Sequence, residues 1–173
     1  MAEEVLDQES REFCMSTLAR YRKRGGFKQL LHLVETSVEK KRENLLRVIE
    51  AEDHYWAECI RERMLTIEKV LSWEAEPLER IMSEFSEEVW VKCLFALPET
   101  ERQPTLEKVT QFKSSAQQKH VAEAMNDATP TSGEVEAAGL MVIKKVRQLQ
   151  GSGDFRPEQF DPKLAISDLD NFV

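Results

Sequence analysis

The residue types that could bind a metal or act as nucleophiles are few in this chain, and they are scattered. The three cysteines are Cys14, Cys59 and Cys93, and the three histidines are His32, His54 and His120. Zinc sites need such residues in closely spaced pairs, and no Cys-x-x-Cys or comparable pair occurs. Each cysteine lies among apolar positions at helical spacing, which favours a buried free thiol. The sequence therefore predicts no metal site and no cofactor.

The carboxylates also fail to form a catalytic pattern. Neighbouring acids such as Glu87 and Glu88 lie in segments typical of solvated helices, with no sign of a cleft. The chain lacks a Gly-rich phosphate loop, a Gly-x-Ser-x-Gly sequence and a His-Glu-x-x-His sequence. We therefore expect a protein that is not an enzyme.

Composition and charge exclude further classes of protein. The chain has 173 residues, of which 41% are hydrophobic and 32% charged, as is typical of a soluble helical protein. Its net charge of -8 is unsuited to duplex nucleic acid, which attracts a basic face. No apolar run is long enough to cross a bilayer, and the N-terminus MAEEVLDQESREF lacks the regions of a signal peptide. We expect a cytoplasmic protein without direct membrane insertion.

The elements that carry these residues all show helical spacing of their apolar positions, so the predicted fold is all-α. A helix is expected from about Gln8 to Lys23, and Gly25 and Gly26 then end it and let the chain turn. Short amphipathic helices follow as far as Met64. None could bury its apolar face alone, so together they indicate one right-handed, armadillo-like unit.

The segment Ile60–Trp73 joins this unit to the rest of the chain. A charged amphipathic helix changes character at Met64, Leu65, Thr66 and Ile67 without a Gly or Pro. One interpretation is an apolar junction that controls movement between two helical modules. The other is an ordinary helix facing a core. Trp73, at the end of the segment, would be a good interface anchor if it were exposed.

A small helical bundle is expected after the junction. The apolar segment EVWVKCLFAL belongs at its centre, a weaker helix is broken near Pro104, and a polar helix begins at Ser114 or Ser115. Capping boxes are expected at Thr36 to Glu39 and at Thr131 to Glu134, and Asp53 is expected to cap the helix that ends at Met64. The last long helix ends at Gly151–Ser152–Gly153.

Three stretches give the chain a family resemblance. RGGFKQLLHLV, IRERMLTIEKVL and GEVEAAGLMVIKKVRQLQGSGDF occur in the order and at the intervals found in the C-terminal half of the bacterial flagellar motor switch protein FliG. The middle stretch resembles the Met-Phe-x-Phe hinge of that family, with Met64 kept and Leu65 and Ile67 replacing the aromatics. The resemblance covers roughly residues 8 to 155. It implies no counterpart of the family's N-terminal domain or of most of its middle armadillo unit.

The resemblance implies a division into four parts and a set of protein partners. The expected parts are a connecting helix at residues 1–24, an armadillo-like unit at 25–63, a bundle at 64–155 and an acidic, flexible tail at 156–173. Gly25 and Gly26 would form the turn between the first two parts. The expected partners are proteins of the switch complex (C-ring) or of a related secretion apparatus, reached at the cytoplasmic face of the inner membrane. Assembly with further copies of the chain is left open.

The resemblance also identifies a helix that would face the stator. Residues 114–127 correspond to the family's charged torque helix, and Lys113, Lys119, Glu123 and Asp127 are its candidate stator-facing residues. A stator contact depends on complementary charges on an exposed face. Most of the family's charged positions are replaced here, so we expect the torque function to be largely lost.

The tail has two open interpretations. Its apolar residues Leu164, Ile166, Leu169 and Phe172 alternate with acids, as in a segment that folds into a partner's groove. It resembles the peptide by which another switch protein captures a phosphorylated chemotaxis regulator. Alternatively, it docks on its own bundle or stays disordered.

These observations predict a non-enzymatic, FliG-like adaptor of the flagellar rotor that works as a scaffold for other proteins. The alternative is a diverged helical regulatory or chaperone-like adaptor of a type III secretion-related or other non-motor assembly.

Overall fold

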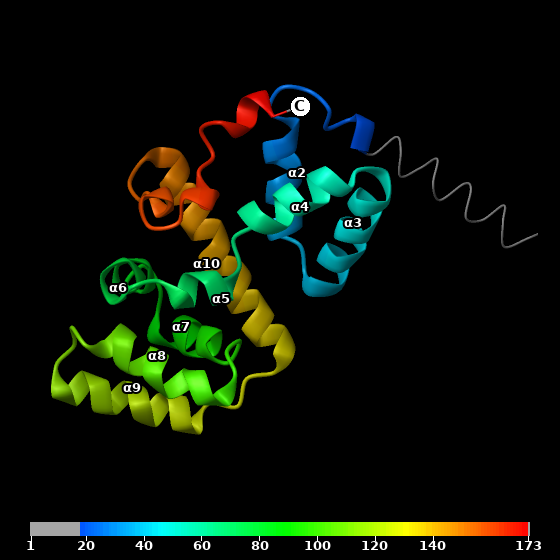
Figure 1. The fold of residues 1–173 in the computed structure, drawn as a ribbon. Coiled ribbons are helices and arrows are strands. Elements are labelled where there is room, and N and C mark those ends of the chain that lie inside the picture. Colours follow the sequence, from blue (N-terminus) through cyan, green and yellow to red (C-terminus); the bar gives the residue numbers. More distant parts are fainter. Residues whose placement is uncertain (1–17, 173) are drawn as a thin grey trace, which may run out of the picture. The chain divides into compact units, whose positions relative to one another are not determined.

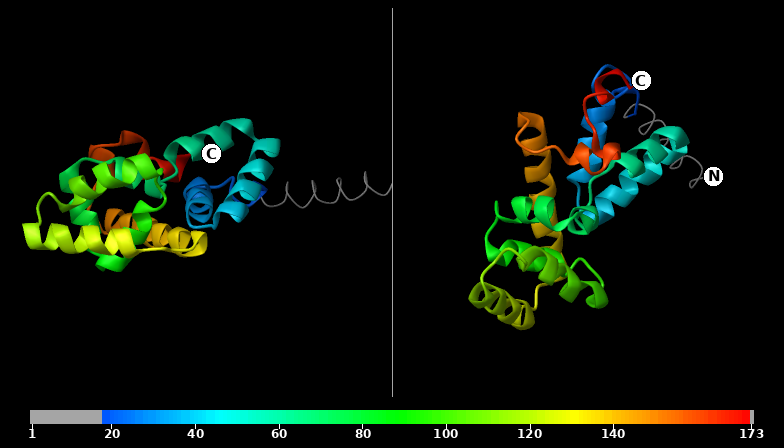
Figure 2. Two further views of the ribbon diagram at one scale, coloured as in Figure 1. Left: turned by 90° about the horizontal axis from the view of Figure 1, so that it is seen from below. Right: turned by 60° about the vertical axis from the view of Figure 1, so that its left-hand side comes forward.

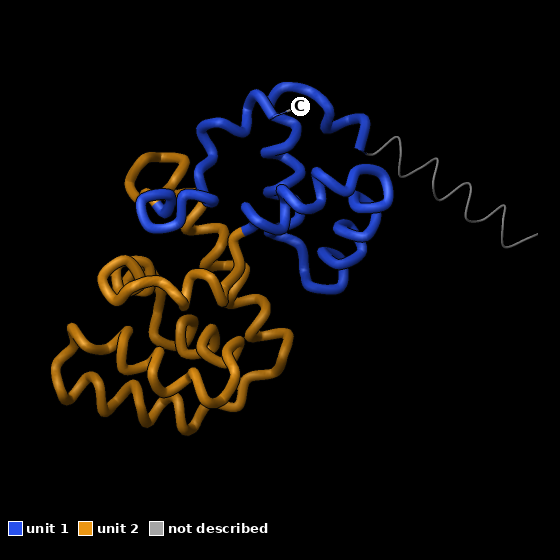
Figure 3. The backbone as a smooth tube through the Cα atoms, in the orientation of Figure 1, with its two compact units in different colours: residues 1–64, 157–173 blue, residues 65–156 orange. Residues whose placement is uncertain are grey.

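A computed structural model describes residues 18–172, and every regular element in that range is helical. The prediction of an all-α fold is therefore confirmed. The helices form two compact units, which Figure 3 shows in different colours. Unit 1 comprises residues 1–64 and 157–173, and unit 2 comprises residues 65–156. In sequence, unit 2 is thus an insertion between the two segments that build unit 1.

In unit 1 the described part of the chain includes the α-helices α2 (Gly26–Glu35), α3 (Glu39–Glu52) and α4 (His54–Arg63) (Figure 1). Helix α3 contacts both α2 and α4, and Figure 2 shows α3 and α4 packed side by side. The core is formed by buried apolar side chains from these helices and their flanks, namely Leu18, Phe27, Leu30, Leu31, Val34, Ile49, Trp56, Ala57, Cys59, Ile60 and Leu169. Each large side chain buried there contributes about 1.5–3 kcal/mol, which holds the short helices together.

Gly25 and Gly26 allow the tight entry into α2. Gly25 has φ 74°, a left-handed conformation that favours glycine. A Cβ atom on Gly26 would lie 1.8 Å from the carbonyl oxygen of Tyr21, so no other residue fits there without a backbone shift. The helix expected before these glycines lies mostly outside the described residues. In the described residues, Leu18 and Ala19 are helical and the chain then turns.

Unit 2 contains six α-helices: α5 (Ile67–Ser72), α6 (Ala75–Met82), α7 (Glu87–Leu94), α8 (Glu99–Thr110), α9 (Ser115–Asp127) and α10 (Ser132–Ser152). Helix α7 contacts α8, α9 and α10, which confirms the central position predicted from its apolar sequence. The long helix α10 also packs against α5, and Gly139 makes the close approach possible (Figure 2). Across the described helices, none is long and apolar enough to cross a membrane.

The predicted helix caps are partly confirmed. Asp53 accepts a hydrogen bond from the backbone N–H of Trp56 at 3.0 Å, and Thr131 and Glu134 form a capping box. The capping box expected at Thr36 is wrong, because the Thr36 hydroxyl donates back to the carbonyl of His32 at the end of α2. The break expected at Pro104 is also absent. Helix α8 continues through Pro104, where the proline removes one hydrogen-bond donor near an exposed first turn.

Residues 157–172, which we call the C-terminal segment, form three 3₁₀ turns rather than a free tail. These are η1 (Pro157–Gln159), η2 (Pro162–Leu164) and η3 (Leu169–Asn171), and η2 contacts α4 while η3 contacts α2. The apolar side chains that alternate with acids in this segment pack against helices of unit 1. This packing is the physical reason that the segment is ordered. Leu164 and Leu169 are fully buried.

Candidate protein-interaction sites

The candidate hinge, Met64 to Ile67, spans the boundary between the two units, which falls between Met64 and Leu65. Met64 ends α4 through a 2.7 Å hydrogen bond from its N–H to the carbonyl of Ile60, and its side chain packs on the core of unit 1. Thr66 caps α5 by accepting a hydrogen bond from the N–H of Lys69 at 3.3 Å.

The far end of the candidate hinge is held in unit 2. The side chain of Ile67 lies against Gly139 of α10, 3.3 Å from the position that a Cβ atom would take there. Met64 and Thr66 have extended backbone, whereas the residues on either side are helical. Met64, Leu65 and Thr66 therefore form a short non-helical connection between α4 and α5, and the residues at its two ends, Met64 and Ile67, pack into different units.

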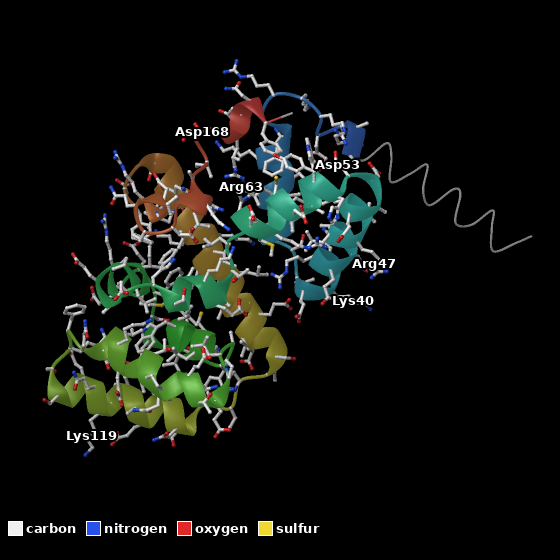
Figure 4. The ribbon with its side chains drawn as sticks, in the orientation of Figure 1. Lys40, Arg47, Asp53, Arg63, Lys119 and Asp168 are labelled. Carbon is white, nitrogen blue, oxygen red and sulfur yellow. The ribbon has the colours of Figure 1, made fainter. Side chains whose placement is uncertain are left out.

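The candidate stator-facing residues lie on or beside α9. Lys119, Glu123 and Asp127 are exposed, and Lys113 is half-buried just before the helix. Figure 4 shows Lys119 pointing away from the other helices of unit 2. Lys119 and Glu123 form an ion pair of 3.9 Å, whereas Lys113 and Asp127 lie at opposite ends of the helix. The face therefore has mixed charge, and part of that charge is already neutralised within α9.

A second charged feature of unit 2 lies where α7, α9 and α10 meet. The Lys92 ammonium is 2.8 Å from a carboxylate oxygen of Glu88 and 3.5 Å from one of Glu134. The hydrogen bond to Glu88 is the main reason that the pKa of Lys92 is raised. The three residues line a cavity of about 380 Å³ together with Glu87 and the loop at Thr129–Pro130. No local sequence pattern pointed to it, since Lys92 and Glu134 are far apart along the chain.

Unit 2 has a second cavity, of about 340 Å³, and the charged residue that lines it, Lys108, has a structural role. Lys108 lines it and donates a hydrogen bond of 2.8 Å to the carbonyl of Leu71, in the last turn of α5. Burial lowers the pKa of Lys108. A cation at the C-terminal end of a helix satisfies an otherwise unpaired carbonyl, so Lys108 serves as a cap from outside the helix.

The apolar side chains of the C-terminal segment meet three aromatic residues of unit 1. The Phe172 ring lies 4.2 Å from the Phe27 ring and 6.1 Å from the Trp56 ring, between centroids. It also stacks on Tyr55 at 6.0 Å with an interplanar angle of 11°. Leu164, Ile166 and Leu169 are the other residues singled out in the sequence. The structure places Leu164 and Leu169 in the interior and packs Ile166 against the core.

Trp73, considered as an exposed anchor, is buried instead. The centroid of its ring lies 5.8 Å from that of the Phe155 ring, and the guanidinium of Arg80 lies over the Phe155 ring. Arg80 also donates a hydrogen bond to the carbonyl of Asp154, just after the C-terminal end of α10. Trp73 therefore belongs to the packing that fixes the end of α10 within unit 2.

The described residues offer no catalytic arrangement. Within residues 18–172 no three His, Cys, Asp or Glu side chains gather as metal ligands. Cys59 and Cys93 are buried free thiols, and Cys14 lies outside the described residues. Burial raises the pKa of the Cys93 thiol to about 12, so it stays protonated at neutral pH and is a poor nucleophile.

The fold defines a protein whose described elements are all helical and form two units. Residues 47–156 match the family described as the FliG C-terminal domain, and the chain belongs to that family. Neither the curated proteins nor the solved structures gave a significant match. The family relates the chain to the flagellar motor switch, whose FliG component is not an enzyme and interacts with other switch proteins.

Proposed function

We propose that this protein is a non-enzymatic scaffold of the flagellar rotor switch complex, located at the cytoplasmic face of the inner membrane through its partners. The surface of α9 carries the proposal. The family match includes the whole helix, yet its exposed face has mixed charge and an internal Lys119–Glu123 ion pair. A torque helix needs charge that complements the stator, whereas a scaffold needs only the shape and apolar contacts of the fold.

The junction at Met64–Ile67 supports the same proposal. Its two ends are packed into different cores, so a small number of backbone torsions at Leu65 and Thr66 can set the orientation of one unit relative to the other. A scaffold with such a joint can adapt to neighbouring proteins in a ring. In this proposal the contacts are with switch proteins, and no cofactor or metal takes part.

Co-purification tests the scaffold role. We expect the tagged full chain to retain switch-complex proteins from motile cells at physiological ionic strength, with the tag alone as the control. Retention of none of them would reject the rotor assignment. It would favour an adaptor in a type III secretion-related or other non-motor assembly, for which the mixed charge on the exposed face of α9 is the supporting observation.

Charge reversal tests the absence of a torque role. We expect Lys119→Glu and Glu123→Lys to leave swimming speed unchanged, because in the proposed scaffold role the exposed face of α9 makes no charge-dependent contact with a stator. The matched control is Lys144→Glu, an exposed lysine on α10. Speed and torque would be measured on tethered cells. A large loss from either α9 variant, but not from the control, would show that α9 still drives rotation.

A further inference from the structure

The backbone joins the two units at two places, because unit 2 is inserted between the two segments that form unit 1. We call the peptide bond between Met64 and Leu65 the first connection and the peptide bond between Arg156 and Pro157 the second connection. A single connection would leave the units free to swivel about its bonds. A second connection adds a restraint, whose strength depends on how firmly its two ends are held.

The end of the second connection in unit 2 is held at the end of α10. Phe155 is buried, its ring packs with that of Trp73, and its backbone N–H donates a hydrogen bond of 3.2 Å to the carbonyl of Leu149. The N–H of Asp154 donates to the same carbonyl at 2.9 Å, and the Arg80 guanidinium donates to the carbonyl of Asp154. The chain is therefore fixed in unit 2 as far as Phe155.

The end of the second connection in unit 1 is part of that unit's core. The turn η1 begins at Pro157 and contacts η2, which in turn contacts α4. Leu164 and Leu169 are fully buried, and Leu169 belongs to the core cluster of unit 1. The Lys163 ammonium also lies 3.6 Å from a carboxylate oxygen of Glu62 on α4. The C-terminal segment is therefore an integral part of unit 1.

The stretch between these two anchors is a single residue. Arg156 is exposed, whereas Phe155 and Pro157 on either side of it are buried. Two successive residues span at most about 7 Å between Cα atoms, so the two anchors cannot move farther apart than that. The first connection is equally short, because Met64 packs on the core of unit 1 and Leu65 is fully buried. Neither connection has slack.

We propose that the C-terminal segment is a second tether, which restricts the joint between the units to rotation about the line through the two connections. A body held at two points retains only this one rotation. Torsions at Leu65 and Thr66 therefore reorient unit 2 only together with torsions around Arg156. The tether is a property of the chain alone, so it goes beyond the scaffold role and does not depend on the rotor assignment.

A flexible insertion in the second connection tests the tether without altering a buried side chain. The variant carries about six Gly and Ser residues between Arg156 and Pro157, which span roughly 13 Å on average. The matched control carries the same insertion between Ala128 and Thr129, in the loop from α9 to α10 within unit 2. Both insertions lengthen the chain equally and cost little in loop closure.

Double electron–electron resonance between spin labels in the purified full chain reports the motion. One label replaces Arg47 of α3 and the other Lys119 of α9, since both residues are exposed and each belongs to a different unit (Figure 4). Labels carried on unnatural amino acids leave the cysteines unchanged. We expect the insertion in the second connection to broaden the distance distribution at least about twofold, because it supplies the missing slack. The control insertion should leave the width unchanged.

A label pair within unit 1 shows that the C-terminal segment keeps its place. Labels at Arg24 and Arg47, both exposed in unit 1, should give the same narrow distribution in the variant as in the unaltered chain. A second variant has the insertion between Met64 and Leu65. It should also broaden the distribution between units, because both connections are required for the restraint.

Two results would overturn the second tether. One is an unchanged width between units after insertion between Arg156 and Pro157, together with broadening after insertion between Met64 and Leu65. In that case the first connection alone would control the joint. The other is a width that neither insertion changes, which would show that the connections do not limit the motion of the units.

Discussion

At the residue scale, the adjacent glycines Gly25 and Gly26 have different physical roles. Gly25 adopts a left-handed φ of 74° and donates its N–H to Asp170 in the C-terminal segment. Gly26 has ordinary helical backbone, but its Cα lies against the carbonyl of Tyr21. The sequence indicated a turn from this pair, yet a single glycine would also have ended a helix. The second glycine is needed because the backbone at Gly26 passes close to the carbonyl of Tyr21, and only the folded structure shows this contact.

Replacing Gly26 tests this close approach. We expect Gly26→Ala to lower the free energy of unfolding by more than about 1 kcal/mol, because the added Cβ forces a backbone shift against Tyr21. The control is Gly133→Ala in the first turn of α10, where a Cβ would meet nothing within 4 Å. That substitution should stabilise the protein by about 0.4–1 kcal/mol. Urea denaturation measures both, and equal effects would contradict the packing argument.

The capping box of α10 predicts a dependence on pH. Hydrogen bonds from the backbone and side chain of Thr131, together with the nearby Lys92 ammonium, hold the pKa of Glu134 below its ordinary value of 4.5. A lowered folded-state pKa gives stability that is present above the unfolded pKa and lost as pH falls through the folded value. The capping carboxylate should therefore stabilise the native state at neutral pH but not in acid.

Glu134→Gln isolates this effect, because glutamine keeps the shape of the cap without the charge. We expect the variant to have a lower Tm than the native chain at pH 7, with the difference vanishing below the folded-state pKa. Glu136→Gln, two residues further along α10, is the comparison at each pH. A Tm difference that persisted unchanged in acid would rule out the carboxylate as its source.

At the element scale, α10 combines a packed face and an open face in one long helix. Gly139 lies against Ile67 of α5, whereas Gly151 meets nothing within 4 Å. The apolar stripe of α10 was visible in the sequence, but the different environments of its glycines were not. Helical spacing predicts the side of the helix on which a side chain lies. The space available on that side depends on the neighbouring helix, which the spacing does not predict.

Gly139 and Gly151 of α10 should respond oppositely to added side chains. Gly139→Leu is expected to lower the free energy of unfolding by about 1–3 kcal/mol, because the larger side chain collides with Ile67. Gly151→Ala should raise it by up to about 1 kcal/mol through helix propensity alone. Thermal unfolding followed by circular dichroism distinguishes them. A neutral Gly139→Leu would mean that α5 and α10 separate easily.

At the scale of the whole molecule, the chain leaves unit 1 after Met64 and returns at Pro157, so two segments distant in sequence share one core. Leu169 from the second segment joins Phe27 and Trp56 from the first. Each unit also has its own tryptophans, with Trp56 in unit 1 and Trp73 and Trp90 in unit 2. The stability of each unit can therefore be followed separately.

Core truncation should affect the two units unequally. Leu94→Ala in unit 2 is expected to cost about 2–5 kcal/mol in the free energy of unfolding of that unit, because the side chain is fully buried. Leu30→Ala in unit 1 is the matched variant. Fluorescence of chains that retain only Trp56 or only Trp90 would report each transition. Transitions that shift together in both variants would show that the molecule unfolds as one cooperative body.

Local patterns in the sequence were enough to predict the helical class, the central position of α7, the caps at Asp53 and Thr131 and the family of the chain. These depend on local spacing and on short-range hydrogen bonds, which a sequence displays directly. Packing between distant parts of the chain buries Trp73 and brings Phe172 to an aromatic surface formed by Phe27, Tyr55 and Trp56. Those outcomes depend on contacts between residues far apart in the chain, and no local pattern encodes which of several apolar surfaces an apolar side chain will meet.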